Sequence, residues 1–141
     1  MKLQTLASRY LAIPCALLCL ASAHAGDHDA HVLPAVPVEP AAQLMVEAPL
    51  AAPLAKGLVV VPFRAEHMKI LPVYGEAALR VAPRIGHLHI TVDHAAWHWL
   101  QSNEEPIVIQ GLPRGPHNVT LELADANHHV LAVKQLDFTI P

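Results

Sequence analysis

The stretch HLHITVD, residues His87–Asp93, alternates strictly between polar and apolar side chains. Its second, fourth and sixth residues are Leu, Ile and Val. Successive side chains of a β-strand point to opposite faces. The stretch therefore predicts a β-strand whose aliphatic side faces the core. On the other side, the imidazoles of His87 and His89 leave the same face about 7 Å apart.

Similar short patterns recur along the chain and predict the fold class. We expect strands over residues 43–47, 58–63, 68–73, 107–110, 118–124 and 130–140, with a short helix as the alternative for 43–47. Residues 97–99 are expected to pair with the strand over 87–93. Residues 130–140 form either one last strand or two strands joined by a bulge, because the side of the strand that carries the apolar residues changes between Val133 and Leu136. Because Pro and Gly turns separate these strands, the pattern predicts an all-β, antiparallel, immunoglobulin-like β-sandwich.

The first 25 residues have the order of a bacterial Sec-type signal peptide. A short positive region precedes the apolar stretch Tyr10–Leu20, and small residues lead to a cleavage site after Ala25, with Ala23 as the alternative. Cys15 and Cys19 both lie in this segment, so the mature chain has no thiol for a disulfide or a metal. We expect a periplasmic or secreted protein.

Residues 26–41 are rich in Pro and Ala and predict a disordered tether. Pro34, Pro37 and Pro40 prevent a continuous helix or a paired strand. The folded domain is expected over residues 42–141.

Composition excludes several classes of function. Nine basic against twelve acidic residues leave no basic surface for nucleic acid. No Gly-rich phosphate loop indicates a nucleotide enzyme, and no apolar run is long enough for stable membrane insertion after signal removal. The mature chain offers only Ser102 for a Ser-His-Asp triad, in a polar turn, so we expect a protein that is not an enzyme. A metal-dependent enzyme, with Glu122 or Asp93 as general base, is the remaining alternative.

The eleven histidines point to metal chemistry instead. His87 and His89 are spaced to be two ligands of one Zn²⁺ or Cu²⁺ ion. His98 is the leading third ligand, because the turn after Asp93 returns the chain toward His89. Asp93 shares the parity of the two histidines and is either a ligand or a group that orients one. Further candidates are His94, His128, His129 and Glu122.

A second metal site is predicted at the mature N-terminus. Cleavage after Ala25 leaves the sequence Gly26-Asp27-His28. The free amine, two amide nitrogens and the third-position imidazole make a square-planar set that Cu²⁺ prefers.

His117 has a structural interpretation rather than a functional one. It shares the inward parity of Val119 and Leu121, and it follows a turn rich in Gly and Pro. We therefore expect a buried, hydrogen-bonded histidine at a corner of the sandwich.

Three motifs together resemble a family of small exported bacterial domains of unknown function. They are Gly-His-x-His at 86–89, Trp-His-Trp at 97–99 and Gly-Leu-Pro-x-Gly-x-His at 111–117. The resemblance covers residues 43–141 and implies an immunoglobulin-like fold in a periplasmic or secreted protein. It implies no activity.

These observations support two hypotheses of function. The first is a non-catalytic domain that binds Cu or Zn through its histidine face, with binding that weakens below about pH 6.5 as the imidazoles protonate. The alternative is a metal-free module that contacts a protein partner in the cell envelope. It predicts a solvated face with dispersed imidazoles, and contact through Trp97 and Trp99 or an edge strand.

Overall fold

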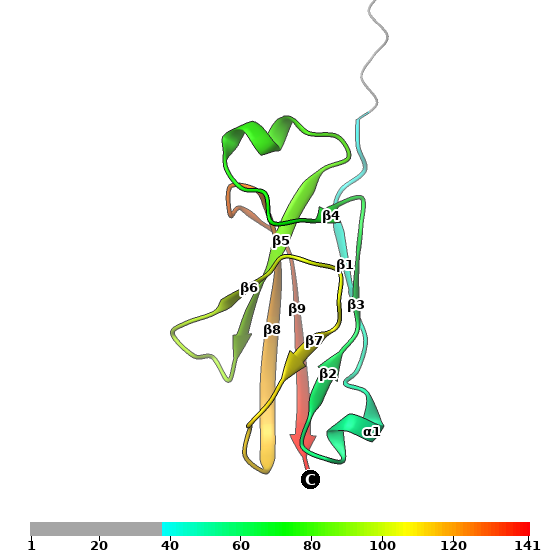
Figure 1. Cartoon of the computed structure of the whole chain (residues 1–141), viewed down its shortest axis with the longest axis vertical. Coiled ribbons are helices and arrows are strands. Elements are labelled where there is room, and N and C mark those ends of the chain that lie inside the picture. The colour runs from blue at the N-terminus through cyan, green and yellow to red at the C-terminus, as the bar shows by residue number, and fades with distance from the viewer. Residues whose placement is uncertain (1–37) are drawn as a thin grey trace, which may run out of the picture. The chain divides into compact units, whose positions relative to one another are not determined.

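The computed structural model describes residues 38–141, which form a β-rich domain (Figure 1). The predicted all-β fold with antiparallel sheets is confirmed. The predicted signal peptide, most of the tether and the Gly26-Asp27-His28 copper site lie outside the described residues. Within residues 38–141, the helices are too short to cross a membrane.

Three long antiparallel strands form one layer of the domain. They are β5 (Ile85–Val92), β8 (Gly115–Asp125) and β9 (Val130–Ile140), and they lie side by side in that order (Figure 1). On the other edge of β5, β6 (Trp99–Gln101) pairs antiparallel and the short β4 (Lys69–Ile70) pairs parallel. Residues 97–99 were expected to pair with β5, and of these Trp99 does so.

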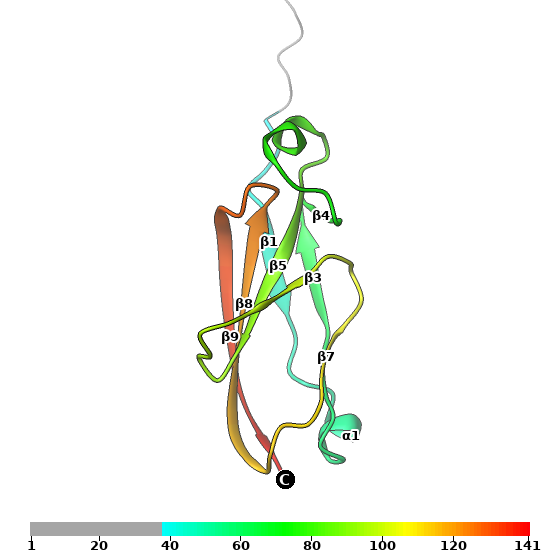
Figure 2. The same ribbon diagram turned by 60° about the vertical axis from the view of Figure 1, so that its left-hand side comes forward.

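The opposite layer contains two antiparallel pairs. β2 (Val59–Val61) pairs with β7 (Ile107–Ile109), and β1 (Gln43–Val46) pairs with β3 (Phe63–Glu66). Figure 2 shows β3 and β7 on one side of the domain and β8 and β9 on the other. A short helix, α1 (Ala51–Leu54), connects β1 to β2.

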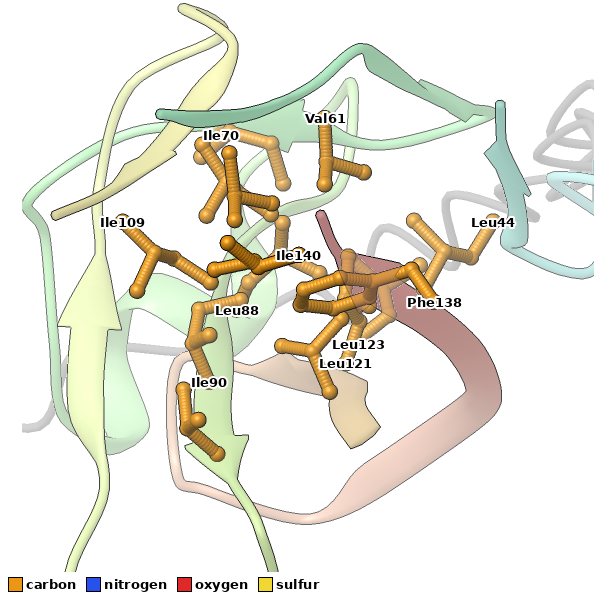
Figure 3. Packing of buried hydrophobic residues seen from close by; sticks show 14 of the residues in the cluster. Leu44, Val61, Ile70, Leu88, Ile90, Ile109, Leu121, Leu123, Phe138 and Ile140 are labelled. Atoms are coloured by element: carbon orange, nitrogen blue, oxygen red, sulfur yellow. The ribbon is translucent and has the colours of Figure 1, made fainter. Parts of the chain in front are cut away.

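Strand parity places the core between the two layers (Figure 3). Leu88 and Ile90 of β5 are fully buried and stand opposite Leu123 and Leu121 of β8 in the register. Removing each such aliphatic side chain from water contributes about 1.5–3 kcal/mol. The aliphatic face predicted for residues 87–93 is therefore the centre of the core.

The start of β5 has room only for glycine. A Cβ atom on Gly86 would meet the backbone carbonyl oxygen of Ala124 and the sulfur of Met68. β8 and the segment before β4 approach this point closely because Gly86 has no side chain. The glycine of the Gly-His-x-His motif therefore has a packing role at the residue preceding His87.

The bulge predicted between Val133 and Leu136 is wrong. Leu136, Lys134 and Ala132 stand opposite Val119, Leu121 and Leu123 without a slip. Val133 lies on the outer face with 53% of its surface exposed. The irregularity lies instead at Leu131, where the partners of adjacent β8 residues are Ala132 and Val130. An exposed valine was interpreted as a core residue, since hydrophobicity alone does not assign a face.

His117 is the buried corner histidine that the sequence predicts. The residue is 9% exposed, with Nδ1 2.8 Å from the Asp93 carboxylate and Nε2 2.9 Å from the Pro113 carbonyl oxygen. Because both nitrogens face acceptors, only the doubly protonated imidazolium donates to both. The hydrogen bond to Asp93 accordingly raises the pKa of His117. The backbone N–H of Asn118 and then His117 lower the pKa of Asp93.

We expect the charged His117–Asp93 pair to make stability depend on pH. A raised histidine pKa adds stability that is present below about pH 6.5 and is lost as the pH rises through the folded-state pKa. The Asp93→Asn variant, which keeps an acceptor but removes the charge, should therefore lose more unfolding free energy at about pH 5.5 than at about pH 8.5. Urea unfolding measures both values. Equal losses at the two pH values would contradict this assignment.

Candidate metal centre

His87 and His89 lie together on the face of β5 opposite the core. Their Nε2 atoms are 3.0 Å apart, and the ring centroids are 5.0 Å apart. The two side chains lie on the same face of β5, as the alternation predicts. This face is not exposed to solvent. His87 is 0% and His89 is 7% exposed, so the alternative of a solvated histidine face is wrong for this pair.

A third imidazole reaches the pair from the turn between β8 and β9. The Nδ1 atom of His128 lies 3.1 Å from Nε2 of His87 and 3.1 Å from Nε2 of His89. The strand register explains the approach, because Asp125 at the end of β8 stands opposite Gly86. The turn that follows Asp125 therefore lies near the start of β5. We call His87, His89 and His128 the histidine triad.

The three triad nitrogens form a nearly equilateral triangle that fits one ion. The centre of such a triangle is about 1.8 Å from each nitrogen, which is less than the Zn–N distance of about 2.0–2.1 Å. The three nitrogens are therefore close enough together for all of them to bind one such ion. With three protein ligands, a bound ion would be able to accept a further ligand.

His87 and His89 are uncharged at neutral pH. Burial lowers the pKa of His87 to about 4, and repulsion from His128 and then His89 adds to this effect. Burial, followed by repulsion from His98 and His128, also lowers the pKa of His89. A neutral imidazole keeps one lone pair, which is the form that binds a metal. These two ligands thus stay available below the ordinary histidine pKa of 6.5.

Hydrogen bonds alone do not satisfy the triad. An imidazole nitrogen carries either a proton or a lone pair, and a proton on one nitrogen points mainly at one neighbour. Three mutual contacts of 3.0–3.1 Å therefore leave at least one pair of nitrogens unfavourably opposed. A single cation interacts favourably with all three lone pairs at once.

The other nitrogen of His87 has an unusual environment. Its Nδ1 atom is buried and finds no hydrogen-bond partner within residues 38–141. When Nε2 is the ligand atom, Nδ1 carries the proton, and an unsatisfied buried N–H costs about 1–3 kcal/mol. Metal-binding histidines usually donate this N–H to an oxygen atom. The fold thus buries His87 at a cost that core packing does not explain.

Tyr74 covers the triad from the loop before η1 (Glu76–Arg80). Its ring stacks on His128 at 6.0 Å between centroids and meets the His87 ring edge-on at 5.1 Å. The Tyr74 and Ser102 hydroxyl groups share a hydrogen bond of 2.7 Å, which holds the ring in place. One carboxylate lies nearby, since Glu122 is 3.9 Å from Nδ1 of His89.

The structure places the other predicted ligands outside the triad. The His98 ring stacks on His89 with 4.6 Å between centroids, so it is a neighbour of the triad rather than one of its three members. The Asp93 carboxylate instead forms hydrogen bonds with the His117 side chain and the backbone N–H of Asn118. His129, a further candidate, contacts Asp125.

Sequence reasoning included His128 only as a further candidate. The composition of residues 125–129 indicated a turn, and an antiparallel alignment of the strand over 118–124 with that over 87–93 would have placed the turn beside His87. Tyr74 had no detectable signal in the sequence, because it comes from an irregular loop.

Comparison with protein families adds one match. The family DUF6130, described as a family of unknown function, matches residues 3–141. This range extends beyond residues 43–141, over which the sequence motifs suggested a resemblance. Comparison with curated proteins and with solved structures found no match. The chain therefore belongs to the DUF6130 family, a family of unknown function.

Proposed function

We propose that this domain binds one Cu²⁺ or Zn²⁺ ion through Nε2 of His87, Nε2 of His89 and Nδ1 of His128. The observation that carries the proposal is the convergence of these three nitrogens to within 3.1 Å of one another. Imidazole nitrogens suit Cu²⁺ and Zn²⁺, whereas Mg²⁺ and Ca²⁺ require oxygen ligands. We propose a binding role outside the cytoplasm, supported by the signal-peptide pattern of residues 1–25.

Between the two ions, Cu²⁺ should bind more tightly. Nitrogen ligands follow the order in which Cu²⁺ exceeds Zn²⁺, and the triad includes no carboxylate or thiolate to alter that order. The ion that the protein carries then depends on which metal its compartment supplies.

The alternative of a metal-free interaction module predicts imidazoles dispersed over a surface. The rings of the triad instead lie 4.6–5.3 Å apart between centroids, and two of the three, those of His87 and His89, are buried, whereas His128 is exposed. Trp97 remains 64% exposed and is available for a partner, but no feature of its surroundings specifies one. The packing of the histidines therefore supports the metal hypothesis over this alternative.

The first prediction concerns the ligands. Isothermal titration of the mature protein with Zn²⁺ should give one site, and His87→Ala, His89→Ala and His128→Ala should each weaken it by at least about 100-fold, because each removes a direct ligand. Zn²⁺ is used because the predicted amino-terminal site favours Cu²⁺.

Two variants serve as controls for this titration. His67→Ala removes a histidine outside the triad and should leave the Zn²⁺ affinity unchanged. His98→Ala removes only the ring stacked on His89 and should change the affinity less than about tenfold. A His87→Ala/His89→Ala double variant that binds Zn²⁺ as the wild type does would disprove the proposed site.

The second prediction separates function from stability. Leu at position 87 removes the unsatisfied Nδ1 atom and keeps an apolar side chain against Tyr74. The metal-free His87→Leu protein should be as stable as the wild type or up to about 1–3 kcal/mol more stable. It should lose the rise in melting temperature that Zn²⁺ gives the wild type. Thermal unfolding with and without Zn²⁺ measures both, and a marked loss of metal-free stability would show that His87 is retained for packing.

A further inference from the structure

We propose that Asp125 is the positioning residue of the metal centre, because it holds His128 where its Nδ1 atom meets the other two ligands. This inference rests on the proposed function, since it concerns what sets the affinity of the same site. Asp125 is not itself one of the three converging ligands.

The Asp125 side chain holds the residues on either side of His128. Its Oδ1 atom accepts the backbone N–H of Asn127 at 2.7 Å and that of His129 at 3.0 Å. Its Oδ2 atom lies 3.3 Å from Nδ1 of His129. One carboxylate thus fixes the backbone immediately before and immediately after His128.

The backbone of His128 needs this support. Its φ angle is 65°, in the left-handed region that residues other than glycine seldom adopt. Such a conformation persists where surrounding contacts determine it. Two backbone hydrogen bonds help, from His128 N–H to the Asp125 carbonyl oxygen and from Asp125 N–H to the His129 carbonyl oxygen. Without the carboxylate, fewer contacts hold residues 127–129, and the φ angle of His128 can return to the negative values that most residues adopt.

The beginning of the turn is fixed independently of Asp125's carboxylate. Ala126 is buried in a small cluster with Ala78 and Ile85, and its carbonyl oxygen accepts the N–H of Gly75 at 2.8 Å. Gly75 follows Tyr74, whose ring stacks on His128. Figure 1 shows the η1 loop and the β8–β9 turn at the same end of the domain. Loss of the carboxylate should therefore free the His128 end of the turn and leave the fold in place.

Asp93 provides a matched control within the same chain. It also accepts a backbone N–H, from Asn118 at 2.9 Å, and also pairs with a histidine, His117 at 2.8 Å. Asp93→Ala and Asp125→Ala therefore remove similar interactions, but only the second contacts the turn that carries His128. If metal affinity falls only because the fold is destabilised, it should fall in both variants. If Asp125 positions His128, it should fall in Asp125→Ala alone.

The test compares Asp125→Ala, Asp125→Asn and Asp93→Ala with the wild type. Zn²⁺ affinity is measured by competition with a chromophoric chelator, and the ligand set is read from the visible absorption spectrum of the Co²⁺-loaded protein. Asp125→Ala should weaken Zn²⁺ binding by about 10–100-fold, as substitutions that disturb ligand orientation do. Its Co²⁺ spectrum should change as His128 leaves the ligand set.

The two other variants should behave differently. Asp125→Asn retains an oxygen for both backbone N–H groups and should recover most of the affinity and the wild-type spectrum. Asp93→Ala should keep Zn²⁺ affinity within about threefold and leave the spectrum unchanged, even where urea unfolding shows that it is less stable. Wild-type affinity and spectrum in Asp125→Ala, or an equal loss in Asp93→Ala, would overturn the positioning role.

A metal-free measurement separates this inference from the proposed function. In the metal-free protein, proton NMR should show a cross-peak between the Tyr74 and His128 rings, which Asp125→Ala should weaken or abolish and Asp93→Ala should preserve. If the wild type binds no metal but this pattern holds, the proposed function fails and the positioning of His128 by Asp125 stands. If the wild type binds metal and the cross-peak persists in Asp125→Ala, the positioning role fails alone.

Discussion

The arrangement of this domain depends on β5 being buried on both of its faces. Seven of its eight residues are buried, although its sequence alternates between polar and apolar side chains. The aliphatic side is covered by the opposite layer, and the histidine side is covered by a loop and a turn at one end of the domain. Burying the second face takes two imidazoles out of water, which is unfavourable unless their polar atoms find partners. The arrangement of the histidine triad follows from that constraint.

The same burial gives the triad its chemical character. Desolvation keeps His87 and His89 uncharged, and the close register of β5 and β8 brings the turn with His128 over them. A solvated histidine face would protonate near pH 6.5 and allow the rings to separate. Here burial holds His87 and His89 in place, so the arrangement of the proposed ligands does not depend on an ion. Preorganisation of this kind reduces the ordering that binding otherwise requires.

The sequence predicts much of the fold but only part of the candidate site. The period-two alternation in residues 87–93 is a local property, so it predicts both the core side of β5 and the shared side of His87 and His89. His128 joins them through a pairing between strands distant in the sequence, and local patterns do not report such pairings. His98 was favoured because it follows β5 closely in the chain, and its ring does reach His89, but by stacking rather than within the triad. Tyr74 comes from a loop without periodicity.

The ligands of the triad are separated by 41 residues between His87 and His128. An ion held by both would act as a reversible crosslink that closes this segment, which contains β6, β7 and β8. Separating β5 from β8 at the end where Gly86 pairs with Asp125 would then require a metal–nitrogen bond to break, in addition to the hydrogen bonds between the two strands. A bound ion should therefore slow the separation of β5 from β8. The end of this strand pair that contains Gly86 and the triad should open after the opposite end, near Val92 and Val119.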